Sequence, residues 1–485
     1  MSTEFLTLCV ILLVLTAFGG LLCCRAIARA SGTYVNLKCL IIANYILIQP
    51  VSGIVHLTRG SGGFRGYYDL LQGDARTTFM ATIICVLGMV ALCVACMRGW
   101  RPVRRGDAAI RHQWLSKTEI WIICVAAALM LVPALNAFVM LTSYVAELRA
   151  ARVIAVDGGL ARYAFIANWL VWVITLIALL IVGRRTPAPP WITLVVVGCA
   201  VVLIAASVSW TGGRSLVLLL VLPLILTLLP RLRRVQWFAL PVAAVSSIVY
   251  LVTVSATRSN SLVHGTGVSL ANWLDWEWGR FSASGFASRY VGEQGLLYGE
   301  TFLRGVTAAV LAPLKLVGLP VPYLDLRSTT EITGLEILGN SDLIYIVPGL
   351  SAELYMNFGL LGILLGYYFL GRVCVTVDAW IASTSGVLER LALYFVGAVL
   401  LLRTIPMDSS AFYVFVFFTG FPLLACAWAA RLLRRRAAHA LPAATPPRGR
   451  RPLPGASVPG SRPARLPAGQ GSPKLYRQPS SEDEY

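Results

Sequence analysis

Charged residues stand at the ends of long apolar segments, and these few residues are where the chain could perform chemistry. Arg214 follows two glycines in the turn Trp210-Thr-Gly-Gly-Arg-Ser215, between two apolar segments. Glycine backbone lets N–H groups approach a ligand closely, and a guanidinium matches the oxygens of a phosphate. The turn therefore predicts an anion site at the start of a helix. The alternative is a hairpin turn whose arginine extends to the membrane surface.

A second pair of charges brackets the short sequence Thr-Ile-Pro-Met near the end of the chain. Arg403 precedes it and Asp408 follows it. These two residues could form an ion pair, or they could serve a reaction as cation and base. Glu353, at the start of another apolar segment, is a further candidate base because a carboxylate there is partly withdrawn from water.

The long polar segment 256–342 combines charged residues with tryptophan and phenylalanine. Its sequences Trp273-Leu-Asp-Trp-Glu-Trp278 and Arg280-Phe-Ser-Ala-Ser-Gly-Phe286 are typical of a folded platform, on which sugar rings stack against aromatic faces. Alternatively, the segment is a folded cap whose charges pair with one another. The candidate substrate-binding residues are Arg258, Asp275, Glu277, Trp278, Arg289 and Arg304, and Arg280 is a catalytic candidate.

Within this segment, residues 300–318 have apolar residues at helical spacing. Arg304 and Lys315 are eleven residues apart, which places both on one side of a helix. We predict a helix that lies in the lipid headgroup layer with its apolar side inward; a plain structural element is the alternative. Asp275-Trp-Glu277 resembles acidic pairs that bind metal in some enzymes, but so short a match does not support a site, and we predict no metal.

The composition sets the class of protein that positions these residues. Hydrophobic residues make up 57% of the 485 residues and charged residues 13%, whereas soluble domains carry about 25% charged residues. We predict an all-α polytopic membrane protein with about eleven transmembrane helices and one large extracytoplasmic loop. The predicted spans are Phe5–Cys24, Val35–His56, Thr78–Met97, Glu119–Leu141, Tyr163–Gly183, Trp191–Ser209, Leu216–Pro230, Trp237–Ser255, Glu353–Gly371, Leu391–Pro406 and Ala411–Ala430.

Basic clusters predict the orientation of these spans. The net charge of +19 is concentrated in short segments beside apolar runs and in the C-terminal segment, so membrane orientation explains it and nucleic-acid binding is not expected. Basic residues follow nearly every odd-numbered span. By the positive-inside rule, the N-terminus and the loop 256–342 lie outside and the C-terminus is cytoplasmic. Residues 1–436 form the membrane domain, and the Pro- and Arg-rich segment 437–485 is a disordered cytoplasmic tail.

The order of these motifs resembles a known family. The Gly-Gly-Arg-Ser turn, the large loop with Trp-Gly-Arg280-Phe, the sequence Glu353-Leu-Tyr-Met-Asn-Phe-Gly359-Leu-Leu-Gly362, and Arg403 with Asp408 together resemble Wzy-type O-antigen or oligosaccharide repeat-unit polymerases, including the enterobacterial common antigen polymerases. The resemblance covers roughly residues 190–430. The long Pro- and Arg-rich tail departs from the family's usual pattern.

The resemblance implies a glycosyltransferase, with a GT-C-like fold, in the bacterial cytoplasmic membrane. It would transfer a glycan from undecaprenyl diphosphate to a newly flipped repeat unit on the outer face, without a cofactor. Arginines would stabilise the departing diphosphate, and the candidates are Arg214, Arg280, Arg289 and Arg403. A carboxylate would accept the proton of the acceptor hydroxyl, and the candidates are Asp408, Glu353, Asp275 and Glu277, in that order. Its partners would be membrane lipids, a chain-length regulator and a flippase.

Three other functions remain open from the sequence. A ligase of the O-antigen type would share the carrier lipid and the arginines, and only His264 is available in the loop as its histidine. A lipid-linked oligosaccharide flippase or another transporter would be expected to have short loops and an even number of spans. A noncatalytic membrane scaffold is the last alternative.

Overall fold

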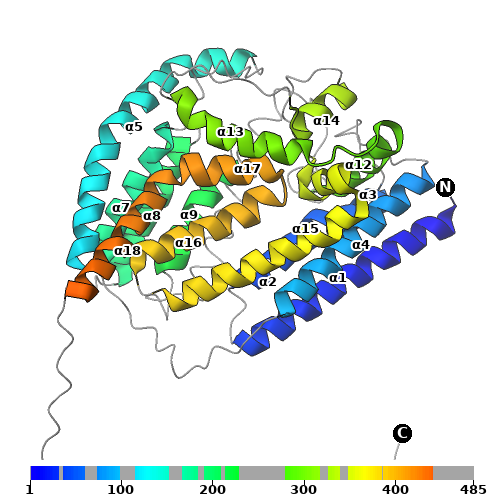
Figure 1. Ribbon diagram of the computed structural model, residues 1–485, viewed down its shortest axis with the longest axis horizontal. Coiled ribbons are helices and arrows are strands. Elements are labelled where there is room, and N and C mark those ends of the chain that lie inside the picture. Colours follow the sequence, from blue (N-terminus) through cyan, green and yellow to red (C-terminus); the bar gives the residue numbers. More distant parts are fainter. Residues whose placement is uncertain are drawn as a thin grey trace, which may run out of the picture. The chain divides into compact units, whose positions relative to one another are not determined.

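The computed structural model describes residues 2–31, 36–59, 74–98, 115–151, 166–183, 190–208, 214–228, 279–316, 326–338, 348–384 and 386–440. All regular elements within these residues are helices (Figure 1). The α-helices are α1 (Thr3–Ser31), α2 (Leu37–Ile46), α3 (Ser52–Arg59), α4 (Ala75–Met97), α5 (Lys117–Ala151), α7 (Trp169–Val182), α8 (Pro190–Val208), α9 (Arg214–Leu228), α12 (Phe281–Gln294), α13 (Glu300–Leu316), α14 (Thr329–Leu338), α15 (Gly349–Ser383), α16 (Val387–Val399), α17 (Ser409–Val414) and α18 (Phe421–Ala440). Three π-helices interrupt them: η1 (Leu47–Val51), η5 (Leu400–Thr404) and η6 (Phe415–Thr419).

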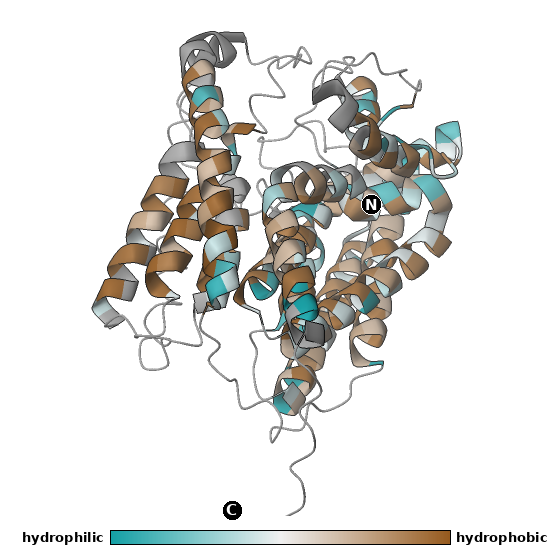
Figure 2. Ribbon diagram, turned by 60° about the vertical axis from the view of Figure 1, so that its left-hand side comes forward, coloured by the Kyte–Doolittle hydropathy of each residue, from teal (hydrophilic) through white to brown (hydrophobic). Residues whose placement is uncertain are grey.

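Five helical segments in the described residues are long and apolar enough to cross a membrane. They are Thr3–Ser31, Leu37–Thr58, Ala75–Met97, Lys117–Met140 and Gly349–Ser383. Hydrophobic residues dominate the long helices in Figure 2. The predicted class, an α-helical membrane protein, is confirmed at this level. The count of eleven spans stays a prediction, and the span predicted over Trp237–Ser255 lies outside the described residues.

Two compact units are distinguished along the chain, Met1–Arg435 and Arg436–Tyr485. The first contains the helices that carry the candidate site. The second is described only through Ala440, the end of α18. The predicted disordered tail 437–485 therefore lies almost entirely outside the described residues.

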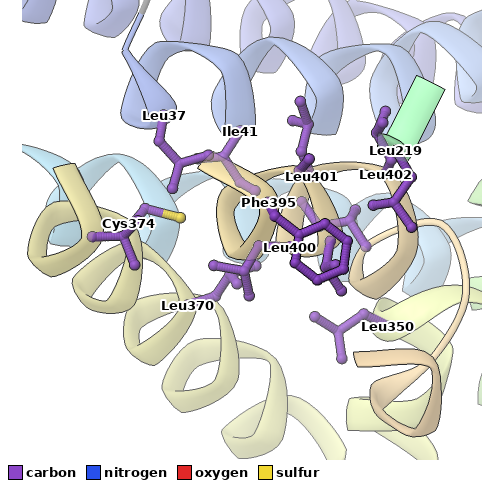
Figure 3. Close-up of a cluster of buried hydrophobic side chains, with 14 of the residues drawn as sticks. Leu37, Ile41, Leu219, Leu350, Leu370, Cys374, Phe395, Leu400, Leu401 and Leu402 are labelled. Atoms are coloured by element: carbon purple, nitrogen blue, oxygen red, sulfur yellow. The ribbon is translucent and has the colours of Figure 1, made fainter. Parts of the chain in front are cut away.

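Helices α2, α4, α15 and α16 share a buried apolar core. Figure 3 shows part of it, where Leu37 and Ile41 of α2 face Leu370 and Cys374 of α15 and Phe395 of α16. Deeper in the same core, the rings of Tyr45 and Tyr367 meet edge to face with centroids 4.9 Å apart. Close helix contact at this depth gives dispersion energy, which drives helix association where lipid replaces water.

Helix α15 is broken at Gly359, which has φ 62° and ψ −149°. This backbone conformation is open essentially to glycine alone. The hydroxyl oxygens of Ser351 and Tyr367 lie 2.6 Å apart, whereas sixteen residues of straight helix would span about 24 Å. The segment 349–358, which we call the short arm, therefore folds back along residues 360–367.

Glycines on the second half of α15 make this fold-back possible. A Cβ at Gly362 or Gly366 would collide with Leu354 of the short arm. The span predicted over Glu353–Gly371 thus differs from the structure. Its apolar composition indicated one straight helix, but the glycines at 359, 362 and 366 instead permit a sharp turn and close packing.

Candidate active site

The segment Arg403–Ser409, which we call the site segment, connects η5 to α17. Two other parts of the chain bind its backbone, the short arm of α15 and Arg280. Ile405 O accepts a hydrogen bond from Leu350 N (3.0 Å), and Pro406 O accepts one from Arg280 Nε (2.7 Å). Ser409 N donates to Glu353 Oε2 (2.6 Å). Because a π-helix and a proline both interrupt regular helical bonding, these carbonyls need partners from outside the helix.

Arg280 is buried, with 7% of its surface exposed, and precedes α12. Besides the bond to Pro406, its guanidinium donates from Nη1 to Gly279 O (2.7 Å). Its aliphatic stem packs on Gly349, where a Cβ would lie 3.0 Å from Arg280 Cγ. Gly349 also has φ +83°, so both its backbone and its lack of a side chain suit this contact.

Arg403 is also buried, with 8% exposed. Its guanidinium lies over the ring of Phe415 in η6, with the carbon 4.3 Å from the centroid, and its Nη1 is 3.3 Å from the sulfur of Met407. Its Nε has no hydrogen-bond partner. No carboxylate among the described residues forms an ion pair with Arg403, so the ion pair with Asp408 considered from the sequence is not formed.

Glu353, in the short arm of α15, is 1% exposed and accepts three hydrogen bonds. Its Oε2 accepts from Ser409 N, and its Oε1 accepts from Ser409 Oγ (2.8 Å) and from Thr301 Oγ1 (3.0 Å). The carboxylate thus caps the N-terminus of α17 and fastens it to α13. In this geometry Glu353 positions the start of α17, including Ser409.

Asp408 is 4% exposed and immediately precedes α17. Its Oδ2 accepts a hydrogen bond from Thr330 Oγ1 of α14 (3.1 Å). Asp408 is therefore oriented by α14, whereas Glu353 is bound by α13. Its neighbour Ser409 is held by Glu353, so the backbone that presents Asp408 is fixed as well.

The break in α15 has a direct role in this arrangement. It releases the carbonyls of Met356 and Asn357, which accept from Leu297 N (2.9 Å) and Tyr298 N (3.1 Å). The Asn357 side chain adds a bond from Nδ2 to Thr301 Oγ1 (2.8 Å) and accepts at Oδ1 from Gly299 N (2.9 Å). The start of α13 is thus joined to the short arm that carries Glu353.

Two arginines predicted to bind substrate lie elsewhere and pair with carboxylates. Arg289 is exposed on α12 and pairs with Glu293 (2.8 Å), which raises the pKa of its guanidinium. Arg304 pairs with Glu331 of α14 (3.5 Å). The helix predicted over 300–318 is confirmed as α13, and Leu303 and Val310 on it are 51% and 65% exposed. Its position in the headgroup layer stays a prediction.

The remaining predicted residues cannot be placed at this site. Arg214 is the first residue of α9, as expected for a turn that leads into a helix, and only its backbone is described. The other candidates lie outside the described residues: Arg258, Asp275, Glu277 and Trp278. In the described part of the chain, no group of three or more His, Cys, Asp or Glu side chains is arranged to hold a metal ion.

Several polar residues of the cluster were missed from the sequence. Thr301, Thr330 and Ser409 orient the two carboxylates, Asn357 binds Thr301, and Gln49 binds Ser284 in the first turn after Arg280. Each is buried. For Gln49 and Asn357 a signal was available, because a polar side chain in an apolar segment is costly and tends to be functional. Thr301 and Thr330 lie in the polar segment 256–342 and Ser409 lies between two predicted spans, so they gave no such signal.

The arrangement combines two buried arginines and two buried carboxylates around one segment. Such a site can bind an anion at the arginines and accept a proton at a carboxylate. Fold and site together define an α-helical membrane protein with a buried polar cluster beside interrupted helices. Comparison of the chain with protein-family models, curated proteins and solved structures finds no match.

Proposed function

We propose that the protein polymerises oligosaccharide repeat units linked to undecaprenyl diphosphate. The observation that carries the proposal is Arg403, a buried arginine that pairs with no carboxylate among the described residues, in the same segment whose Pro406 O binds buried Arg280. A buried cation without an anionic partner is costly, and within a membrane protein such a residue is by default a functional-site hypothesis. A diphosphate supplies several oxygen acceptors for guanidinium groups.

The reaction uses the cluster as follows. The bond between the anomeric carbon of the donor glycan and the diphosphate oxygen breaks, and the diphosphate leaves with the electron pair. A hydroxyl of the acceptor repeat unit forms the new bond to that carbon and gives its proton to a carboxylate. Arg280 and Arg403 stabilise the charge that develops on the diphosphate, which lowers the barrier.

Asp408 is the carboxylate that we assign as the base, and Glu353 positions it. Three donors already bind Glu353, so most of its about four acceptor positions are used for structure. Asp408 follows the site segment directly, and Thr330 orients its Oδ2. Glu353 acts on the reaction through Ser409, whose backbone it binds.

The membrane context extends the proposal. The enzyme would act at the outer face of the bacterial cytoplasmic membrane, with its N-terminus outside and its C-terminus in the cytoplasm. The basic residues Arg434, Arg435 and Arg436 at the end of α18 support this orientation through the positive-inside rule. α13, with exposed Leu303 and Val310, would contact lipid or the carrier chain.

The test is a transfer assay with the purified full-length protein in nanodiscs. Synthetic repeat units on undecaprenyl diphosphate are the only substrate, and the products are separated by gel electrophoresis. We expect a ladder of carrier-linked glycans and one released carrier per bond formed. Arg403→Ala should give no ladder, while Arg431→Ala, which removes an exposed arginine of α18, should give the wild-type pattern.

Other outcomes would replace the proposal. Transfer only to an added lipid A core would identify a ligase. Movement of the lipid-linked unit across vesicle membranes, without any new glycosidic bond, would identify a transporter. A ladder of equal intensity from Arg403→Ala would remove the arginine from the reaction.

A further inference from the structure

Gln49 is a buried amide inside an apolar segment. It belongs to η1, within the candidate span Leu37–Thr58, and is 1% exposed. Pro50 follows it and has no N–H, which favours an interruption of the helical bonding pattern. π-Helical turns of this kind are frequent at functional sites.

The interruption releases one backbone carbonyl. Ser52 N donates to Gln49 O, three residues back, where a regular α-helix bonds four residues back. Ile48 O accepts from Arg280 N (2.9 Å). Arg280 precedes α12, where a backbone N–H has no partner within its own helix. The π-helix η1 and the start of α12 thus satisfy each other's backbone groups.

The Gln49 side chain adds a second connection to the same place. Its Oε1 accepts from Ser284 Oγ (3.4 Å), and Ser284 Oγ also contacts Arg280 O (3.3 Å). Its Nε2 donates to Ser351 Oγ (2.9 Å), which in turn contacts Tyr367 OH (2.6 Å). The hydrogen-bonded side chains around Gln49 are all buried, with Ser284, Ser351 and Tyr367 each 0% exposed.

We infer that Gln49 is a positioning residue for Arg280. It joins the first turn of α12, which begins after Arg280, to the short arm of α15, which carries Gly349 under the Arg280 stem. Arg280 is then held on two sides, by η1 at its backbone and by Pro406 O at its guanidinium. The importance of Arg280 for catalysis rests on the proposed function, but its positioning by Gln49 does not.

The test measures how quickly phenylglyoxal modifies each arginine, since this reagent reacts with accessible guanidinium groups. The full-length protein in nanodiscs is treated for increasing times, and peptides with Arg280 and Arg403 are quantified by mass spectrometry. In Gln49→Leu, we expect Arg280 to react severalfold faster and Arg403 to react at the wild-type rate. Gln49→Glu keeps two oxygens for Ser284 and Ser351 and should keep the slow reaction of Arg280.

The outcomes separate positioning from general damage. Faster reaction of both arginines in Gln49→Leu would indicate misfolding near the site and would overturn the inference, as would an unchanged rate at Arg280. In the transfer assay, Gln49→Leu should lower kcat about 100-fold, the effect of a displacement near 1 Å, and change KM little. Absence of any ladder from wild-type protein would count against the proposed function, while a selective rate change at Arg280 would still support positioning by Gln49.

Discussion

Arg403 and Arg434 lie at opposite ends of the helices that hold the site. α16 begins at Val387, beside Arg434, and leads into η5 with Arg403, about 24 Å away for a regular helix. Arg434 pairs with Glu389 (2.6 Å) and lies 3.6 Å from Glu119. Arg403 packs on Phe415 and Met407 without a described carboxylate partner.

The carboxylates at the Arg434 end serve helix termini. Glu119 Oε1 accepts from Val387 N (3.1 Å), and its Oε2 forms a capping box with Ser116 at the start of α5. Asp378 accepts from Leu37 N (2.9 Å) and Lys38 N (3.2 Å) at the start of α2. At this end Arg434 has two carboxylate partners, whereas at the site end no described carboxylate pairs with Arg403.

The largest expected effect on transfer comes from comparing two single substitutions, Arg403→Leu and Arg434→Leu. Arg403→Leu should reduce transfer at least about 100-fold, because it removes a preorganised cation. It should leave the thermal unfolding temperature unchanged or higher, since an unpaired buried charge is costly. Arg434→Leu should retain transfer at this site but lower the unfolding temperature, because Glu119 and Glu389 lose their partner. Equal destabilisation by both substitutions would abolish the contrast between the two ends.

Glu353→Gln should destabilise the protein by about 2–3 kcal/mol. If the single amide oxygen of glutamine accepts from Ser409 N, the amide nitrogen takes the place of the oxygen that accepted from Ser409 Oγ and Thr301 Oγ1, so these two buried hydroxyls lose their acceptor. Glu293→Gln is the control, because the exposed pair with Arg289 contributes only about 0.3–0.5 kcal/mol. Unfolding by heat or denaturant in detergent measures both. If Glu353→Gln unfolds like the control, Glu353 does not hold α17.

Gly359→Ala should destabilise the protein by about 1–3 kcal/mol, because alanine is strained at φ 62° and ψ −149°. Gly19→Ala is the matched control, since a Cβ there meets nothing within 4 Å. The short arm carries Glu353, so Gly359→Ala should also reduce transfer. Unchanged unfolding in Gly359→Ala would show that the fold-back of α15 does not depend on glycine.

The sequence predicted the helical class and the charged residues of the site more readily than the contacts between them. Apolar runs and helical spacing are local signals, and they located α13 and the long apolar helices. Arg280, Glu353, Arg403 and Asp408 were candidates because charge is rare beside apolar segments. The structure brings all four to the site segment.

The fold-back of α15 and the role of Gln49 depend on contacts that local patterns do not contain. Gln49 and Ser351 are 302 residues apart in the chain. Gly359 and Gly362 were noted as part of a motif and Gly366 was not, and glycines at these positions fit a straight span equally well. Long-range hydrogen bonds between buried groups decide between those possibilities.

Binding of inorganic pyrophosphate tests the central claim, that Arg280 and Arg403 form a diphosphate site, most directly. Isothermal titration calorimetry on the full-length protein in nanodiscs would compare wild type with Arg403→Ala and with Arg431→Ala, which removes the same charge from an exposed position. The account predicts saturable binding that Arg403→Ala weakens about tenfold or more and that Arg431→Ala leaves unchanged. Absence of binding to wild type, or equal weakening by both variants, would contradict it.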